Sequence, residues 1–296
     1  MMTHCWRYNF PSNVLLFKGR YMLVFGLIWL GCVCCGWGNL PAQDTAERSN
    51  FIICYNPTVP SEKFAPYDIV VVDYAYPPKS IAALRQQGKL VFGYLSLGKV
   101  QKQRPYLLAV QQAGIALQQD VNFPDSLRID AGDQKWHALV VESIIPKMKK
   151  AGFAGIFLDD LDDLKIRSLQ DQGVALIQRI RKSNPHLQLM ANRGLEYADR
   201  FSPSVDYLLL ESCFLQNGRK RDPSDSAWAL QLLSVAKAAN PKLKGVAIDY
   251  ISEKKVPLNS DQQRLILEIQ GSHEQNNLLS CVSSRDLQSV PSISDN

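Results

Sequence analysis

The sequence has no low-complexity segment and no long run of charges of one sign. Of its 296 residues, 46% are hydrophobic and 21% are charged, with 17 glycines and 16 prolines. This is the composition of an ordinary globular protein, so a disordered or low-complexity chain is excluded. The length suits one large domain, because α/β barrels commonly occupy about 250 residues as a single unit.

A basic patch is also missing. The formal net charge is +5, but residues 1–42 contain three basic residues and no acidic one, so the remainder has 30 basic and 28 acidic side chains. The cluster Arg219–Arg221 is short and typical of a solvated loop. Because nucleic-acid-binding proteins depend on basic patches or stripes, we do not expect nucleic acid as a partner.

The sequence lacks the motifs of metal and dinucleotide sites. Beyond the first 42 residues the cysteines are Cys54, Cys213 and Cys281, which are widely spaced and lack metal-ligand spacing. Each lies in or just after an apolar run, so we expect buried side chains. No Gly-x-Gly-x-x-Gly follows the first expected strand, which argues against a dinucleotide-binding fold. We therefore expect neither a metal nor a cofactor.

The N-terminal region has a basic flank followed by an apolar stretch. Lys18 and Arg20 precede residues 21–37, which carry no charge. This pattern predicts a secretory signal peptide or an uncleaved signal anchor over residues 1–42, and a nearby cysteine leaves a lipoprotein open. Residues 43–50 then form a linker. The protein is expected to be secreted, periplasmic or membrane-anchored facing outward.

The rest of the chain alternates short apolar runs with helical patterns. The runs are nearly continuous rather than alternating, as in parallel strands buried on both faces. They cover residues 51–55, 68–73, 89–96, 154–159, 187–192, 206–211, 245–250 and 277–282. Helices are expected over residues 80–87, 134–150, 171–183, 227–239 and 260–270, several of them ended by Gly or Asn-Pro.

Eight strands in this alternation predict an α/β fold, a single-domain (β/α)8 TIM barrel over residues 51–285, followed by a C-terminal tail at 286–296. Residues 97–133 are too long for a simple crossover. We expect them to include a large loop over the barrel mouth, and long loops in compact domains are usually functional.

Polar side chains follow seven of the expected strands at their carboxyl ends, where barrel enzymes place their active sites. Two of these, Asp159 and Glu211, flank the strand between them and make a candidate catalytic pair, because glycoside hydrolysis usually needs two carboxyl groups across the scissile bond. A ring of carboxylates, amides and tyrosines also suits carbohydrate. The candidate substrate-binding residues are Tyr55, Asp73, Tyr94, Ser96, Asp162, Asn192, Arg193, Asp249 and Tyr250.

Four segments together resemble glycoside hydrolase family 114, the endo-α-1,4-polygalactosaminidase-like barrels. They are Val91–Val100, Gly152–Asp162, Leu189–Gly194 and Tyr207–Ser212, and the resemblance spans residues 50–285. It implies an exported enzyme that hydrolyses α-1,4-linked galactosamine-containing polysaccharide without a metal. It also implies Asp159 and Glu211 as the catalytic pair.

One position departs from the family pattern. Where the family has Ser-x-Gly-Glu, this chain has Lys99 after Gly98. A lysine near the cleft is expected to disfavour a polycationic substrate, although the other acidic residues would leave the barrel mouth net acidic. Lys99 also motivates an alternative, a catalytically degenerate barrel that binds polysaccharide as an accessory protein. A Lys99 ammonium between the two carboxylates would favour the alternative.

Overall fold

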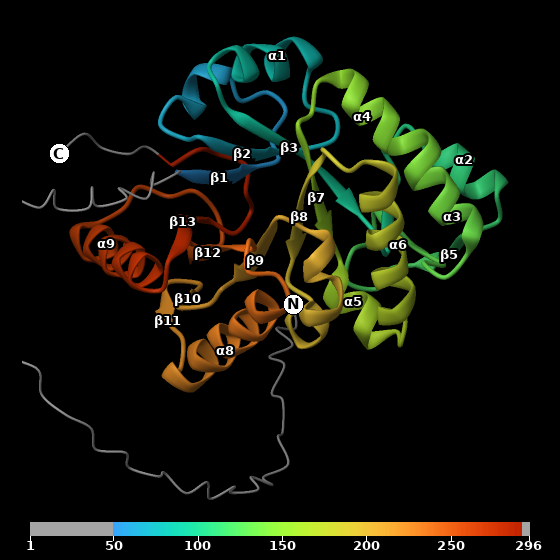
Figure 1. Cartoon of the computed structure of the whole chain (residues 1–296). Coiled ribbons are helices and arrows are strands. Elements are labelled where there is room, and N and C mark those ends of the chain that lie inside the picture. Colours follow the sequence, from blue (N-terminus) through green and yellow to red (C-terminus); the bar gives the residue numbers. More distant parts are fainter. Residues whose placement is uncertain (1–49, 292–296) are drawn as a thin grey trace, which may run out of the picture. The chain divides into compact units, whose positions relative to one another are not determined.

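Eight parallel strands form the centre of the computed structural model, which describes residues 50–291 (Figure 1). All eight lie within two residues of the expected ranges, which confirms the TIM barrel. The first and last strands in the sheet order lie next to each other, so the barrel is nearly closed. In sheet order the strands are β1 (Phe51–Cys54), β2 (Ile69–Val72), β3 (Leu90–Ser96), β7 (Gly155–Asp159), β8 (Gln188–Asn192), β9 (Tyr207–Glu211), β12 (Lys244–Ser252) and β13 (Leu278–Ser284).

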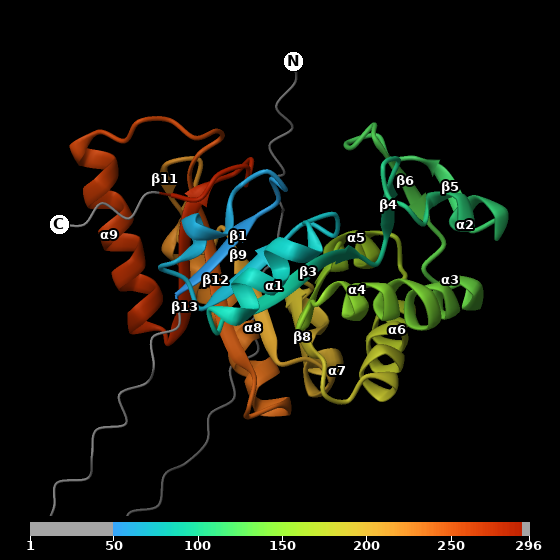
Figure 2. The ribbon, with the colours of Figure 1, turned by 90° about the horizontal axis from the view of Figure 1, so that it is seen from above.

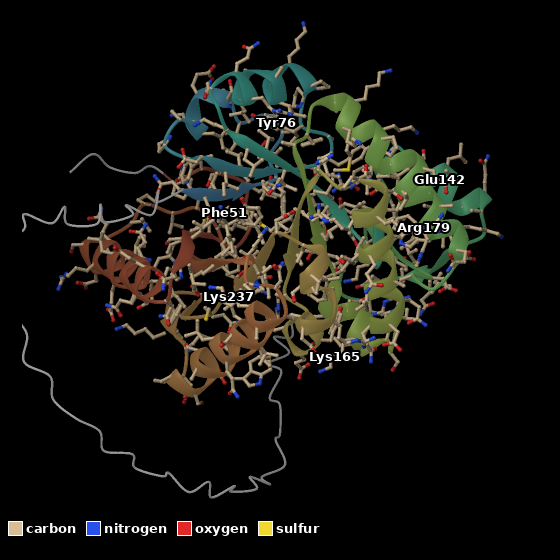
Figure 3. All side chains as sticks on the ribbon, viewed as in Figure 1. Phe51, Tyr76, Glu142, Lys165, Arg179 and Lys237 are labelled. Atoms are coloured by element: carbon tan, nitrogen blue, oxygen red, sulfur yellow. The ribbon has the colours of Figure 1, made fainter. Side chains whose placement is uncertain are left out.

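Helices surround the strands on the outside of the barrel (Figure 1). An ion pair of 3.0 Å joins Arg179 to Glu142 between two of these helices (Figure 3). The helical elements are η1 (Ser61–Phe64), α1 (Pro78–Gln86), α2 (Leu107–Gln112), α3 (Gln134–Leu139), the π-helical turn η2 (Val140–Ile144), α4 (Ile145–Ala151), α5 (Leu161–Ile166), α6 (Gln170–Ser183), η3 (Leu195–Tyr197), α7 (Ala198–Phe201), η4 (Ser202–Ser204), α8 (Pro223–Ala239) and α9 (Ser260–Gln275).

Local sequence sets several helix ends. Asp133 and Asp222 cap the first turns of α3 and α8 by accepting backbone N–H bonds. Asn259 and Gln262 form a capping box at the start of α9. Gly152, with φ of 106°, ends α4 in the left-handed region, as the Ala-Gly signal predicts.

The predicted end of α9 at Gln270 is wrong, because the helix continues through Gly271 to Gln275. Glycine in a helix costs only about 1 kcal/mol relative to alanine. The additional turn carries His273, whose ring is fully buried against β12 and β13. These tertiary contacts outweigh the local stop signal.

Aromatic rings fill the barrel interior. Phe92 of β3 reaches across to Tyr207 of β9, with ring centroids 5.6 Å apart in an edge-to-face arrangement. A Cβ atom at Gly155 of β7 would lie 2.4 Å from the Phe92 ring. Glycine at that position therefore makes room for the ring.

Residues 97–133 form a folded segment rather than an irregular loop. After β3 the chain forms β4 (Lys99–Gln101), α2, β5 (Ala116–Gln119) and β6 (Ser126–Ile129), and the strands pair antiparallel in the order β4-β6-β5. A smaller hairpin, β10 (Leu215–Gln216) and β11 (Arg219–Lys220), follows β9. Figure 2 shows both additions along the same edge of the barrel, beyond the carboxyl ends of β3 and β9.

The expected signal or anchor, residues 1–42, lies outside the described residues, as does most of the linker. Within residues 50–291, no helix is both long and apolar enough to cross a bilayer. Cys54, Cys213 and Cys281 are buried free thiols, as expected.

Candidate active site

Three neighbouring strands end in polar residues that contact one another. Asp159, Asn192 and Glu211 are the last residues of β7, β8 and β9. Each follows a fully buried apolar run and is itself partly exposed. The structure therefore brings the two candidate catalytic carboxylates together at the carboxyl end of the barrel.

The backbone turns sharply just after each of these residues. Asp160, Arg193 and Ser212 have φ of 68°, 61° and 53°, in the left-handed region. Such a conformation costs a residue other than glycine about 1–3 kcal/mol, and it often occurs at functional sites. All three strands therefore leave the barrel in the same way, directly after a site residue.

Asn192 connects the two carboxylates. Its Nδ2 donates to Oδ1 of Asp159 at 2.8 Å and lies 3.5 Å from Oε2 of Glu211. If the Asn192 amide were flipped, its Oδ1 oxygen would face two carboxylates and be repelled by them. The two contacts therefore fix the orientation in which Nδ2 faces both carboxylates. Among the described residues, Oδ1 of Asn192 is then a buried acceptor without a hydrogen-bond partner. A buried acceptor of this kind calls for an explanation, and a substrate donor would supply one.

Asp159 has further donors around it. The Tyr94 hydroxyl and the backbone N–H of Asp160 also bond its carboxylate. Burial raises the pKa of Asp159 and the charge of Glu211 adds to the shift, whereas these hydrogen bonds and that of Asn192 oppose it. The net direction is upward. Glu211 accepts a hydrogen bond of 3.0 Å from the Tyr250 hydroxyl, in addition to the longer one of 3.5 Å from Asn192.

Tyrosine rings lie beside the carboxylates. Tyr55 packs edge-to-face on Tyr94 with centroids 5.1 Å apart, and Tyr94 stacks on Phe157 at 6.2 Å. Burial, followed by the charges of Asp159 and Glu211, raises the pKa of Tyr55 well above its ordinary value. Burial likewise raises the pKa of Tyr94 and Tyr250. All three phenols stay neutral and keep a hydroxyl that can donate.

Asp162 and Arg193 lie at the same end of the barrel and bond each other. The Arg193 Nε is 2.7 Å from Oδ2 of Asp162, and the other oxygen accepts the Gly194 N–H at 2.9 Å. About half of the Arg193 side chain is exposed. This pair ties α5 to the turn after β8.

The expectation that Asp249 contacts substrate is wrong, because its side chain is fully buried on the helix side of β12. Its Oδ2 is 2.6 Å from His273 Nε2, and its Oδ1 accepts the N–H groups of Phe214 and Leu215 at 2.9 and 2.6 Å. Successive strand residues face opposite sides, so Tyr250 turns towards Glu211 while Asp249 turns towards α9. Asp249 fixes the chain just beyond Glu211.

Two other expected contact residues use their polar groups within the protein. Ser96 is buried, and its hydroxyl donates to Asp160 and accepts the N–H of Lys99. Arg104 donates to both oxygens of Asp73, at 2.8 and 2.7 Å. These groups shape the site rather than face a sugar.

The sequence does not predict Arg104 as a residue of the site. It is buried, holds Asp73 and lies 5.5 Å from the Tyr94 ring centroid. No strand pattern marks it, because it comes from the segment after β4 and its partner lies 31 residues earlier. Only the tertiary structure brings it to the site.

The model of glycoside-hydrolase family GH114 matches residues 38–293. The chain belongs to this family. It is therefore a glycoside hydrolase, and the resemblance given by its four sequence segments is confirmed. No curated protein matches the chain.

Solved structures support the GH114 barrel. The glycoside hydrolase domain of PelA from Pseudomonas aeruginosa aligns with a TM-score of 0.68 at 21% identity, covering 82% of this chain and 97% of that domain. Ega3 from Aspergillus fumigatus, solved in complex with galactosamine, aligns with a TM-score of 0.63 at 13% identity, covering 85% and 97%. At these identities the likeness concerns the fold.

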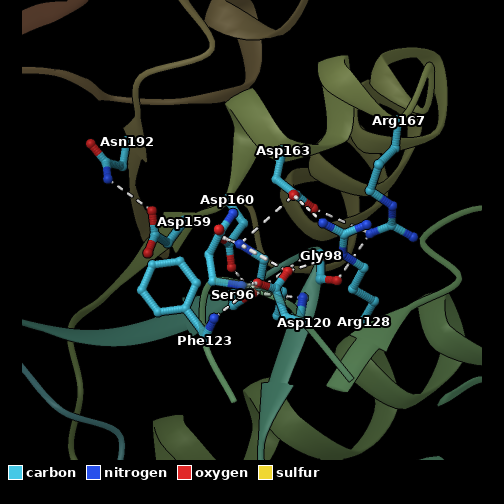
Figure 4. A network of polar contacts seen from close by, with 12 residues as sticks. Ser96, Gly98, Asp120, Phe123, Arg128, Asp159, Asp160, Asp163, Arg167 and Asn192 are labelled. Atoms are coloured by element: carbon cyan, nitrogen blue, oxygen red, sulfur yellow. Dashed lines mark hydrogen bonds and ion pairs between the residues drawn. The ribbon is translucent and has the colours of Figure 1, made fainter. Parts of the chain in front are cut away.

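Lys99, the departure from the GH114 pattern, does not lie between the catalytic candidates. Its ammonium is buried 3.0 Å from Asp160 and 3.8 Å from both Asp120 and Asp163. Figure 4 shows these three carboxylates within one network of polar contacts. Burial lowers the pKa of Lys99 and the carboxylates raise it, with a net upward shift, so the ammonium stays charged. Burial and the charge of Asp159 raise the pKa of Asp160 to about 6.

Basic partners offset much of the acidic charge at the barrel mouth, which stays net acidic through Asp159 and Glu211. Five carboxylates close to Asp159 and Glu211 in the fold have basic partners within 4 Å. These contacts are Asp73 with Arg104, Asp160 with Lys99, Asp162 with Arg193, Asp120 with Arg128 and Asp163 with Arg167. In residues 50–291, no cluster of His, Cys, Asp or Glu is arranged to hold a metal ion.

Proposed function

We propose that Asp159 and Glu211 are the catalytic pair of this hydrolase. The observation that carries the proposal is the Asn192 amide, which contacts both carboxylates at the carboxyl end of the barrel. Barrel enzymes place their chemistry at this end. The neighbouring carboxylates Asp73, Asp160 and Asp162 have basic partners, whereas the proposed pair has none within 4 Å among the described residues.

The donors around each carboxylate support different roles. Asp159 accepts hydrogen bonds from Asn192, Tyr94 and a backbone N–H, which stabilise an anion suited to attack the anomeric carbon. Glu211, with one tyrosine donor, gives its proton to the leaving glycosidic oxygen as the bond to the anomeric carbon breaks. Water, deprotonated by Glu211, then displaces the sugar from Asp159.

We propose that the enzyme retains the anomeric configuration, which the closeness of its two carboxylates permits. Both contact the same Asn192 nitrogen, at 2.8 and 3.5 Å, so the two contacting oxygens lie at most about 6.3 Å apart. Carboxyl groups stand about 5–5.5 Å apart in retaining enzymes and about 6.5–9.5 Å apart in inverting ones. The first product released should therefore have the anomeric configuration of the substrate, which proton NMR of early reaction mixtures measures.

The substrate we propose is an α-1,4-linked, galactosamine-containing polysaccharide. The family resemblance supports this assignment, and Ega3, of similar fold, was solved with galactosamine. The test is incubation of the protein with partially de-N-acetylated galactosaminan. Release of oligosaccharides is expected. Hydrolysis of an unrelated polymer such as starch, with galactosaminan left intact, would contradict the assignment.

The alternative function is a non-catalytic barrel that binds polysaccharide. A Lys99 ammonium between the two carboxylates would favour it. The ammonium of Lys99 bonds Asp160 instead of separating Asp159 from Glu211. That observation removes the reason that Lys99 gives for the binding role, whereas the N-terminal segment, which also motivates that role, lies outside residues 50–291. In addition, we propose that the enzyme acts outside the cytoplasm, because residues 1–42 have the pattern of a signal peptide or anchor.

A further inference from the structure

The Lys99 ammonium also contacts an aromatic ring. Its Nζ lies 4.8 Å from the ring centroid of Phe123, as well as 3.0 Å from Asp160. Asp160 directly follows Asp159. A single lysine side chain therefore separates the Phe123 ring from the residue next to the proposed nucleophile.

Phe123 lies at the tip of the β5–β6 hairpin, and the tip is held in place. Asp120 is buried and accepts the N–H groups of Asn122 and Phe123 at 2.9 and 3.0 Å. The other Asp120 oxygen accepts from Arg128 of β6 at 2.9 Å. The same carboxylate lies 3.8 Å from Lys99, so the hairpin tip is tied to the start of α5.

The tip nevertheless exposes apolar surface. Phe123 is 58% exposed and Val121 is 81% exposed. Leu108 and Leu117 of the same segment, residues 97–133, are also among the exposed large hydrophobic side chains. Contiguous exposed apolar surface marks binding sites, and Phe123 and Val121 lie two residues apart at this tip. The Lys99 ammonium lies against the Phe123 ring, and more than half of the Phe123 side chain remains exposed.

We propose that Phe123 is a sugar-binding platform, on which one residue of the polysaccharide stacks while a neighbouring residue reaches Asp159 and Glu211. The inference rests on the proposed function. Sugar rings have apolar C–H faces that pack on aromatic rings, and the site continues from the catalytic carboxylates through Asp160 and Lys99 to this ring. The occupant is the substrate chain itself.

Lys99 explains why the platform belongs to this chain. Its ammonium attracts the face of the ring, and the surrounding carboxylates hold the ammonium in position. The glutamate of the family pattern has no positive charge to offer the ring. The replacement of glutamate by lysine at position 99 therefore provides a cation that holds the Phe123 ring in place.

The test compares Phe123→Ala with the unaltered full-length protein on polymeric galactosaminan and on a short oligosaccharide that spans only the catalytic pair. Loss of the platform should raise KM for the polymer about tenfold, equivalent to about 1.4 kcal/mol of binding, and leave kinetics on the short substrate unchanged. Phe123→Tyr should restore the KM. Trp228→Ala, on α8, removes an exposed aromatic ring elsewhere and should change neither substrate's kinetics.

The outcomes separate the two proposals. An unaltered protein that cleaves neither substrate contradicts the proposed function. If the unaltered protein cleaves the polymer and Phe123→Ala has the same KM, the platform is wrong. A change in oligomeric state by sedimentation, with KM for the polymer unaltered, would overturn it in favour of self-association through this tip.

Discussion

At the scale of single residues, the Asn192 amide is the main group that opposes the effect of burial on the pKa of Asp159. It donates to Asp159 and leaves Oδ1 as a buried acceptor. In the catalytic proposal, Asp159 reacts as an anion, so every group that stabilises its charge widens the pH range of activity. Burial works against that stabilisation.

The pH profile should show this balance. Burial raises the pKa of Asp159, so a larger fraction is protonated on the acid side and kcat/KM should fall at a higher pH than for an ordinary aspartate. The Asn192 hydrogen bond lowers that pKa, so Asn192→Ala should move the acidic limb to still higher pH. Measurement of kcat/KM against pH for both proteins checks this. An unmoved limb in Asn192→Ala would show that the ionisation observed belongs to another group.

At the scale of secondary-structure elements, buried charged residues connect neighbouring parts of the fold. Lys99 connects β4 to the start of α5, and Asp249 connects β12 to α9 and to the chain after β9. Such pairs do not guarantee stability, but removing one partner leaves a buried charge uncompensated, typically at about 3–5 kcal/mol.

For the Lys99 connection, Lys99→Met should lower the free energy of unfolding by about 3 kcal/mol. Lys99→Glu should lower it further, because it adds a negative charge beside Asp120, Asp160 and Asp163. Lys102→Glu makes the same charge change at an exposed position of the same segment and should have little effect. Chemical denaturation measures all three, and equal stability of Lys99→Glu and Lys102→Glu would refute the account.

A parallel experiment concerns Asp249. Asp249→Ala leaves His273 and two backbone N–H groups without their acceptor, so we expect a loss of about 3–5 kcal/mol in unfolding free energy. Asp261→Ala, which removes an exposed carboxylate from α9, should cost under about 1 kcal/mol. Thermal unfolding of both variants gives the comparison. Similar melting temperatures would mean that the buried pair contributes little.

The sequence predicted the eight strands well, because buried parallel strands form continuous apolar runs that need no knowledge of the partner strand. The sequence could not show which side chains of β12 point into the barrel. That strand continues to Ser252, and whether Asp249 or Tyr250 faces inward depends on the register with β9. Nor could it pair Asp73 with Arg104 or Lys99 with Asp160, since these contacts arise only when distant segments meet.

At the scale of the whole molecule, the family match spans residues 38–293 and the described structure begins at residue 50. The hydrophobic core of the barrel draws on residues from Phe51 onward. The domain boundaries therefore remain a proposal: residues 1–42 as signal or anchor, 43–50 as linker and 51–285 as barrel.

A chain that starts at Ala42 should be soluble and should unfold in a single cooperative transition. The reason is the break in composition at Pro41, after which a polar segment leads to the first core residue that the structure describes, Phe51. Calorimetry and circular dichroism measure this. Aggregation of the shortened chain, with the full-length protein remaining soluble in the same buffer, would show that the leader contributes to the fold.

The most direct measurement of the central claim is turnover after exchange of each carboxylate for its amide. Asp159→Asn and Glu211→Gln keep the size of the side chain and remove its negative charge and its ability to act as an acid or a base. Each should lower the rate of oligosaccharide release from galactosaminan by about 10²–10⁴-fold, with circular dichroism and melting temperature close to those of the unaltered protein. Turnover undiminished in either variant would contradict the assignment of Asp159 and Glu211 as the catalytic pair.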